Sequence, residues 1–322
     1  MEGEMNTANK LTIGIVIPCY NESEIIKTSL AQLYTALIKL TEDGIVDPRS
    51  FVAAVDDGSK DGTWDAIEQQ KMEFPSLRAI KLSRNFGHQN ALLAGMLGFS
   101  EYADCLISVD ADLQDDIGVI GEMIENFRGG SEIVYGVRRK RATDTFLKKW
   151  MALGFYRMME MLGVEIVYNH ADFRLIGKRA LKCLGEYREV NLFLRGIFPL
   201  LGFKASCVYY DRLERKAGHT KFTFGKMLSF AIDGITSFSV KPLRLIAVLG
   251  LTVFAASLVL GAYAVFSYLM LDTVPGWTSI VIPLYLLGGI QLFSIGVIGE
   301  YLGKIFQEVK QRPRFIVEER LD

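Results

Sequence analysis

A long interval without lysine or arginine, between Arg244 and Lys304, dominates the last third of the chain. Two apolar segments fill it, residues 243–271 and residues 280–302. A helix needs roughly 20 apolar residues to cross the hydrocarbon core of a bilayer, so each segment is long enough to span a membrane. Buried core helices are the alternative, but both segments are apolar around their whole circumference. We therefore expect a C-terminal transmembrane hairpin of two helices.

Basic residues flank this predicted hairpin only at its outer ends, and the short connection at residues 272–276 carries none. Loops on the cytoplasmic side of a membrane are enriched in lysine and arginine. We therefore expect a multi-pass protein of the cytoplasmic membrane with both chain ends in the cytoplasm and residues 303–322 as a cytoplasmic tail. The flanking basic residues are Lys241, Arg244, Lys304, Lys310, Arg312 and Arg314.

The first part of the chain, residues 1–224, has a different pattern. Short apolar runs rich in β-branched residues alternate with amphipathic stretches, which is typical of an α/β domain with a mostly parallel sheet and helices on both faces. Ligands of such sheets bind beyond the carboxyl ends of the strands. The predicted strands cover residues 11–18, 51–55, 78–82 and 105–109, and the predicted helices cover residues 24–40, 64–72 and 89–99.

Two further segments have a membrane-facing character. Residues 145–162 mix basic side chains with phenylalanine, tryptophan and methionine, which is typical of a helix lying in the headgroup layer. A surface helix packed on the sheet is the alternative for this segment. Residues 225–242 are interpreted as a juxtamembrane helix. The formal net charge of the 322-residue chain is −1, so no nucleic-acid partner is expected. The membrane-facing segments make membrane lipid an expected partner.

The strongest chemical signal is a pair of aspartates, Asp110 and Asp112, directly after the predicted strand at residues 105–109. Carboxylate oxygens suit hard divalent cations such as Mg²⁺ or Mn²⁺, and a cation there could also hold a diphosphate. Such a cation acts as a Lewis acid on a leaving diphosphate. A capped loop explains two aspartates at this spacing equally well.

Polar clusters also follow two other predicted strands, at residues 18–22 and residues 55–63. Each has a purely structural alternative, because Asn21, Glu22, Ser59 and Asp61 are residue types that cap helices and close turns. Three polar strand ends in one domain nevertheless favour a shared nucleotide-binding crevice over three independent caps.

The chain carries, in this order, the motifs PCYNE (residues 18–22), VDDGSKDGT (55–63), SRNFGHQNALLAG (83–95), VDADLQD (109–115), HADFRL (170–175), NLFLRGIF (191–198) and ERKAGHTKF (214–222). The first four resemble the inverting family-two glycosyltransferases of the GT-A fold. HADFRL and ERKAGHTKF are similar to the polyprenyl-phosphate branch, which includes dolichyl-phosphate mannose synthase. NLFLRGIF and the paired spans look most like the bactoprenol glucosyltransferases.

This resemblance implies roles for residues at the matching positions. Asp172 matches the position of a catalytic base, with a structural pair to Arg174 as the alternative, and Asp112 would act with it in catalysis. An acceptor phosphate that is already ionised needs little help from a base, so orienting a neighbour is a second role for Asp172. The resemblance places Pro18, Tyr20, Asn21, Glu22, Asp57 and Asp110 around the nucleotide-sugar, Asp110, Asp112 and Gln114 around the metal, and Arg138, Arg215 and Lys221 around the lipid phosphate.

The implied reaction is an inverting transfer of a hexose to undecaprenyl or another polyprenyl phosphate. UDP-glucose is the first candidate donor, and UDP-N-acetylglucosamine, UDP-galactose and GDP-mannose stay open. A membrane protein that binds polyprenyl lipid without catalysis is the alternative from a different class. Glycines of the second predicted span would permit close helix packing, either within the hairpin or between the copies of a homo-oligomer.

Overall fold

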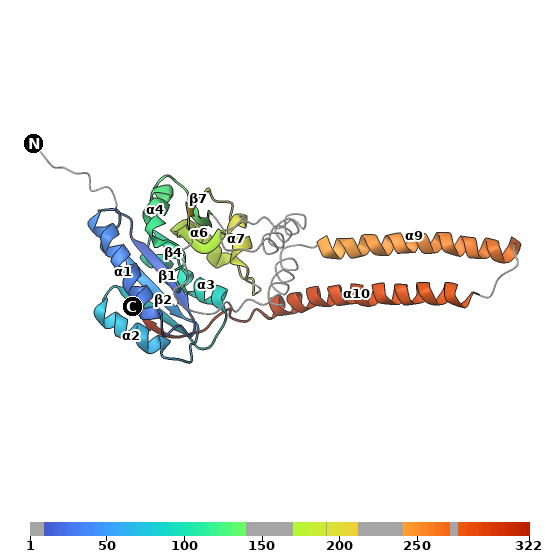
Figure 1. Cartoon of the computed structure of the whole chain (residues 1–322), viewed down its shortest axis with the longest axis horizontal. Coiled ribbons are helices and arrows are strands. Elements are labelled where there is room, and N and C mark those ends of the chain that lie inside the picture. Colours follow the sequence, from blue (N-terminus) through green and yellow to red (C-terminus); the bar gives the residue numbers. More distant parts are fainter. Residues whose placement is uncertain (1–9, 140–169, 191, 212–240, 271–275) are drawn as a thin grey trace, which may run out of the picture. The chain divides into compact units, whose positions relative to one another are not determined.

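The computed structural model describes residues 10–139, 170–190, 192–211, 241–270 and 276–322. The chain divides into two compact units (Figure 1). The first unit comprises Met1–Leu153, Ile166–Lys221 and Arg312–Asp322, and the second comprises Gly154–Glu165 and Phe222–Gln311. Several predictions fall outside the described residues, namely the helix at residues 145–162, nearly all of the juxtamembrane helix at 225–242, and the proposed phosphate ligands Arg215 and Lys221.

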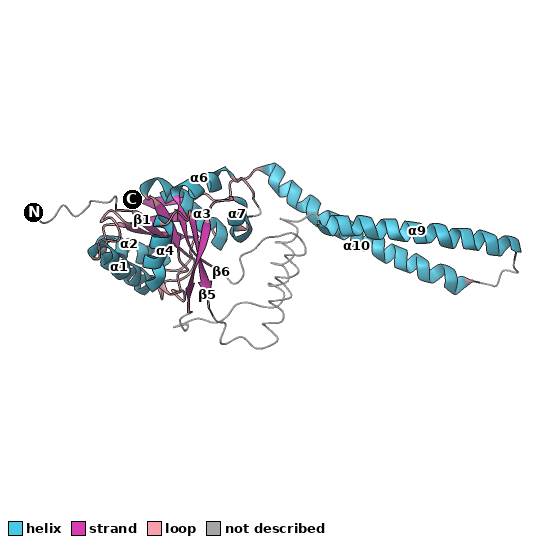
Figure 2. Cartoon of the chain, turned by 90° about the horizontal axis from the view of Figure 1, so that it is seen from above, coloured by secondary structure: helices cyan, strands magenta, loops and turns pink. Residues whose placement is uncertain are grey.

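Within the described residues, eight strands form one sheet in the first unit (Figure 2). They are β1 (Ile13–Cys19), β2 (Phe51–Asp56), β3 (Leu77–Leu82), β4 (Cys105–Ser108), β5 (Ile133–Arg138), β6 (His170–Gly177), β7 (Ala205–Tyr210) and β8 (Val317–Leu321). Their order across the sheet is β7-β5-β6-β4-β1-β2-β3-β8. The central strands β4, β1, β2 and β3 are mutually parallel, whereas β6 is antiparallel to β4 and β5. The carboxyl ends of β1, β2 and β4 therefore share one edge of the sheet.

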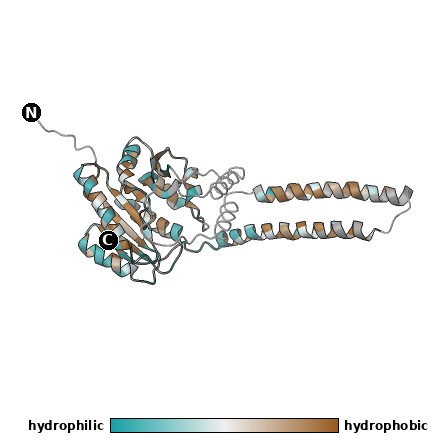
Figure 3. Ribbon diagram, in the orientation of Figure 1, coloured by the Kyte–Doolittle hydropathy of each residue, from teal (hydrophilic) through white to brown (hydrophobic). Residues whose placement is uncertain are grey.

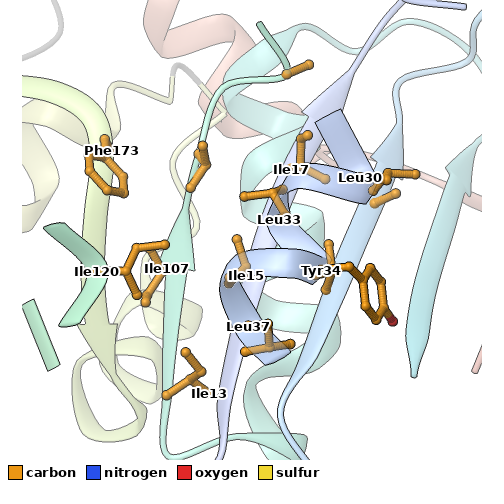
Figure 4. Packing of buried hydrophobic residues seen from close by; sticks show 14 of the residues in the cluster. Ile13, Ile15, Ile17, Leu30, Leu33, Tyr34, Leu37, Ile107, Ile120 and Phe173 are labelled. Carbon is orange, nitrogen blue, oxygen red and sulfur yellow. The ribbon is translucent and has the colours of Figure 1, made fainter. Parts of the chain in front are cut away.

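Helices cover both faces of this sheet. Ile15 and Ile17 of β1 belong to the same core cluster as Leu30 and Leu33 of the first helix (Figure 4). Side chains alternate along a strand, so the intervening Val16 points to the opposite face, where it lies against the third helix. The helices of the first unit are α1 (Ile26–Glu42), α2 (Thr63–Glu73), α3 (His88–Phe99), α4 (Ile120–Arg128), α6 (Lys178–Glu186) and α7 (Leu194–Leu200).

The predicted α/β class, with a mostly parallel sheet between helices, is confirmed. The predicted strands and helices up to residue 109 are present, with ends displaced by one or two residues. For example, α1 occupies Ile26–Glu42 where residues 24–40 were predicted. Hydrophobic periodicity locates these elements well because each buries an apolar stripe or an apolar run in the core.

The sequence pattern did not predict β8. This strand is antiparallel to β3 and pairs Arg320 with Ile80. Four of its five side chains are exposed, so it shows neither an apolar run nor a regular alternation. Just before it, the carbonyl of Ile316 accepts a hydrogen bond of 3.0 Å from the backbone N–H of Ser83. Residues 303–322 were expected to form only a cytoplasmic tail, whereas their last part, β8, completes the edge of the sheet.

The second unit contains two long helices, α9 (Lys241–Met270) and α10 (Trp277–Lys310), which lie side by side (Figures 1 and 2). Both are apolar over most of their length (Figure 3). By length and composition they can cross a membrane, and the candidate spans are Pro242–Leu260 and Leu286–Lys310. The predicted pair of C-terminal apolar helices is thereby confirmed as a candidate membrane hairpin.

Candidate active site

The aspartate pair of the sequence analysis lies on a tight turn at the end of β4. The N–H of Val109 donates to the carbonyl of Val16, which continues the pairing of β4 with β1 by one residue. The chain then turns, because the N–H of Leu113 donates to the carbonyl of Asp110 and Leu113 itself has a positive φ of 43°. Asp110 and Asp112 therefore stand at the shared carboxyl edge of the sheet, as expected for a nucleotide-binding crevice.

The loops after β1 and β2 are joined to each other at the same edge. The N–H of Asn21 donates to the hydroxyl of Ser59 (2.9 Å), and its side-chain oxygen accepts from the N–H of Lys60 (2.9 Å). The N–H of Glu22 donates to the hydroxyl of Thr63 (2.9 Å). Asn21 has a φ of 52°, a left-handed conformation that asparagine tolerates better than most residues. The Asn21 side chain therefore has the structural role that was given as its alternative, which is to close a turn.

The carboxylate of Asp57 organises the approach to α3. Its two oxygens accept hydrogen bonds from the backbone N–H groups of Phe86 (2.7 Å) and Gly87 (2.9 Å). Burial raises the pKa of Asp57, and these two hydrogen bonds oppose that effect. Of the other residues implied around the nucleotide-sugar, Pro18 is buried within β1 and Tyr20 is exposed at the edge of the sheet.

Asp172, on β6 next to β4, lies between two arginines. Arg174 donates from Nη2 to Oδ1 of Asp172, and Arg174 is completely buried, with 0% of its side chain exposed. Arg195, on α7, donates from Nε to Oδ1 (3.2 Å) and from Nη2 to Oδ2 (3.1 Å). Although burial works in the opposite direction, the two guanidinium groups hold the pKa of Asp172 well below its usual range. Such a carboxylate is a weak proton acceptor at neutral pH.

His88, the first residue of α3, joins the two acidic parts of the site. Its Nε2 lies 3.6 Å from Oδ1 of Asp110 and 3.7 Å from Oδ2 of Asp172. About a third of the Asp110 side chain, 36%, is exposed. Loss of hydration, together with the negative charge of Asp172, raises the pKa of Asp110 to about 6, against the opposing effect of His88.

The residues implied around the metal are oxygen donors of a suitable kind. Asp110 and Asp112 offer carboxylates, and Gln114 is buried with its side-chain nitrogen lacking a hydrogen-bond partner in the described part of the chain. Among the described residues, no group of three or more His, Cys, Asp or Glu side chains forms a complete metal-binding cluster. Two carboxylates and an amide leave positions for water and phosphate oxygens, as is usual for Mg²⁺ at phosphate sites, so the donor set fits such an ion.

Arg138, expected at the lipid phosphate, pairs with a buried carboxylate. Its Nε and Nη2 lie 3.1 Å and 2.9 Å from Oδ1 of Asp115. Asp115 follows Gln114 directly, so this pair fastens β5 to the turn that carries the aspartates. No role was predicted from the sequence for Asp115, His88 or Arg195. Each of these residues is recognised by its partner on another strand or helix, and the spacing of residues along the chain does not reveal such partners.

Comparison with known proteins places the chain among sugar-transferring proteins. The family described as "Glycosyl transferase family 2" matches residues 14–185, and the family described as "GtrB C-terminal hairpin" matches residues 241–305. An uncharacterized glycosyltransferase of Bacillus subtilis, YkoT, is 50% identical over 94% of this chain and 90% of its own length. A prophage-derived bactoprenol glucosyl transferase of Shigella flexneri is 36% identical over 96% of this chain and 98% of its own length.

Among solved structures, a mannosyltransferase from Pyrobaculum calidifontis, in complex with GDP-mannose and Mn²⁺, aligns with 92% of this chain and 88% of its own. The sequence identity is 16% and the TM-score is 0.47.

Proposed function

The chain belongs to glycosyl transferase family 2, and from this premise we propose that it transfers a hexose from a nucleotide-sugar, UDP-glucose first among the candidates, to a polyprenyl phosphate. The observation that carries the proposal is the turn with Asp110 and Asp112 at the carboxyl edge of the sheet, in a chain that also has two candidate membrane helices. The relationship to bactoprenol glucosyl transferases over nearly the whole chain supports the same acceptor.

Asp110 and Asp112, with Gln114, would hold a divalent cation, Mg²⁺ or Mn²⁺, which when bound neutralises negative charge on a leaving diphosphate. The joined loops after β1 and β2 would line the nucleoside side of the crevice, with Tyr20 as their exposed aromatic group. Asp57 accepts one backbone N–H bond on each oxygen, which holds the loop before α3 in place and leaves acceptor capacity for the nucleoside.

The transfer proposed here is a single displacement at the anomeric carbon. An oxygen of the lipid phosphate forms the new bond to that carbon, the bond to the nucleoside diphosphate breaks, and the configuration inverts. A phosphate monoester is largely dianionic at neutral pH, so no proton has to be removed from the nucleophile. The strongly acidic Asp172 is therefore suited to orienting Arg174 and Arg195, and a general base is not required.

The membrane arrangement that we propose rests on the distribution of charge. The basic residues at the outer ends of α9 and α10 favour a cytoplasmic position for both ends of the hairpin, where a soluble nucleotide-sugar is available. We propose that residues 1–224 form the catalytic domain and that Arg312–Asp322 complete it through β8.

The direct test mixes the purified full chain, undecaprenyl phosphate and Mg²⁺ or Mn²⁺ with each of four radiolabelled donors, UDP-glucose, UDP-N-acetylglucosamine, UDP-galactose and GDP-mannose. Label from one donor in the organic phase, lost on addition of EDTA, is the expected result. Binding of undecaprenyl phosphate without transfer from any donor would instead favour a lipid-binding protein that does not catalyse transfer.

A further inference from the structure

Arg195 is the only arginine of α7, and it reaches the site from a helix that overlaps the NLFLRGIF motif, which indicated a family resemblance but no chemical role. Building on the transfer reaction proposed above, we propose that Arg195 binds a phosphate anion of the reaction, and that Asp172 is the positioning residue that holds its guanidinium in place. The anion is either the monophosphate of the lipid acceptor or the diphosphate of the donor. Both present the same chemistry to an arginine.

The three charged groups, Arg174, Asp172 and Arg195, are buried to different extents, which indicates different roles. The Arg174 side chain is 0% exposed and that of Asp172 is 14% exposed, whereas 31% of the Arg195 side chain is exposed. Asp172 therefore neutralises a guanidinium that is shielded from solvent, and Arg195 is the member of the group that a ligand can reach.

The guanidinium groups around Asp172 are of the kind that binds phosphate oxygens. Arg174 and Arg195 both contact the single carboxylate of Asp172. The strongly depressed pKa of Asp172 keeps that carboxylate ionised at neutral pH, so both ion pairs persist there. Asp110 and Asp112 are suited to a cation a short distance away, on the far side of His88. An anion at this site would thus meet two positively charged groups: a divalent cation held by the aspartates, and Arg195.

Contacts at two points along α7 fix the position of Arg195. At the start of the helix, the N–H of Leu194 donates to Oε1 of Gln89 (2.8 Å). One turn later, the ring of Phe198 lies against the buried guanidinium of Arg174, 4.7 Å from ring centroid to Cζ. A guanidinium held in advance loses less freedom when it binds an oxyanion, and its planar fork matches two phosphate oxygens at once.

The decisive experiment measures equilibrium binding to the full-length protein in detergent, using two probes separately: undecaprenyl phosphate, and UDP with Mg²⁺. The variants are Arg195→Gln and Arg195→Lys. Arg49→Gln is the matched control, because Arg49 also pairs with one aspartate, Asp47, but its side chain is 79% exposed and it lies at the far end of β2. Thermal unfolding of each variant is recorded alongside.

Loss of a charge-assisted contact predicts that Arg195→Gln weakens the binding of one probe by about 10- to 100-fold, while Arg49→Gln changes neither. Weaker binding of undecaprenyl phosphate identifies the acceptor phosphate, and weaker binding of UDP identifies the donor diphosphate. Arg195→Lys keeps the charge but loses the fork, so it should weaken the same probe by a smaller factor. This variant decides the question if Arg195→Gln is not stably folded.

Unchanged binding of both probes to a stably folded Arg195→Gln or Arg195→Lys protein would overturn the proposal. The positioning role of Asp172 has its own readout, because Asp172→Asn should weaken the same probe, and the double variant should bind no more weakly than Arg195→Gln alone. Additive losses would contradict that role. These experiments measure binding and not transfer. A wild-type protein that transfers no sugar would therefore count against the proposed function, while the binding data would still test the role of Arg195.

Discussion

Gln89 and Leu194, 105 residues apart in the chain, are joined by a hydrogen bond of 2.8 Å from the backbone N–H of Leu194 to the side-chain oxygen of Gln89. The first N–H groups of a helix have no partner within the helix, so Gln89 acts as a cap supplied by another element. Its neighbour His88 faces Asp110 and Asp172. The first turn of α3 therefore contacts both the acidic groups of the site and the helix that carries Arg195.

Replacement of Gln89 by alanine should lower both stability and activity. The variant leaves the N–H of Leu194 without its partner, which costs about 1 kcal/mol or somewhat more for a partly buried group. Because α7 also positions Arg195, we expect a fall in the rate of sugar transfer beyond what a loss of folded protein explains. Thermal unfolding and transfer per folded molecule are the two measurements.

Gln69→Ala is the control for this change. Gln69 also accepts a hydrogen bond through its side-chain oxygen, from Nζ of Lys27 (2.7 Å), but on the exposed face of α2. It should leave both measurements unchanged. Equal effects of the two alanine variants would mean that the link from α3 to α7 has no special importance.

The strand ends of this site could be predicted from the sequence because each follows a buried apolar run. Asp110 and Asp112 lie at the carboxyl edge expected from the strand before them, and the joined loops of β1 and β2 lie at the same edge. Parallel pairing forces this convergence, so local pattern and topology together were sufficient.

Side-chain partners could not be predicted in this way. Arg138 was expected at a lipid phosphate from the family resemblance, and its guanidinium engages the buried Asp115 from the turn after β4, a pair that the resemblance did not indicate. Arg195 meets Asp172 only because α7 packs beside β6, and β8 returns to β3 from the far end of the chain. These pairs depend on tertiary packing, for which a single sequence carries no periodic signal.

Removal of the Asp112 carboxylate should abolish metal-dependent transfer. Asp112→Asn keeps the size of the side chain but weakens its affinity for a hard cation, and loss of several kcal/mol of charge stabilisation corresponds to a fall in rate of at least about 100-fold. Activity should recover in part at high Mn²⁺ concentration if the ion still binds weakly. The measurement is transfer to undecaprenyl phosphate across a titration of the metal.

Asp116→Asn is the matched control, four residues away. Asp116 accepts a hydrogen bond from the N–H of Gly118 (2.9 Å), a capping contact that asparagine also makes well. This variant should keep wild-type metal dependence. A similar loss in both variants would indicate that general negative charge in the loop, and not a ligand at Asp112, supports the reaction.

Gly58 is required by the close approach of two loops. Its φ is +64°, and a Cβ at this position would lie 2.5 Å from Cα of Arg84. Gly58→Ala should therefore displace the loop before α3, which Asp57 holds, and destabilise the protein by at least about 1 kcal/mol. Gly121→Ala, inside α4, places its Cβ at an ordinary van der Waals distance of 3.8 Å from Cδ2 of Leu40, so it should be neutral or stabilising by up to about 1 kcal/mol. Thermal unfolding of the two variants should shift in opposite directions or, at the least, unequally, and equal destabilisation would contradict the packing described here.

Asp172→Asn should cost the same stability across the neutral pH range. In the folded protein the pKa of Asp172 is well below its ordinary value of about 3.9, so its stabilising contribution is complete above that value and is lost only as the pH falls through the lower folded pKa. Without the carboxylate, the completely buried Arg174 loses its counter-charge, and breaking such a pair costs about 3 kcal/mol. Urea unfolding of the full chain in detergent at about pH 7.5 and about pH 9, both above the pKa of about 6 of the neighbouring Asp110, should therefore give the same difference between variant and wild type. A difference that grew between these two pH values would show that Asp172 titrates there, which would restore the case for a general base.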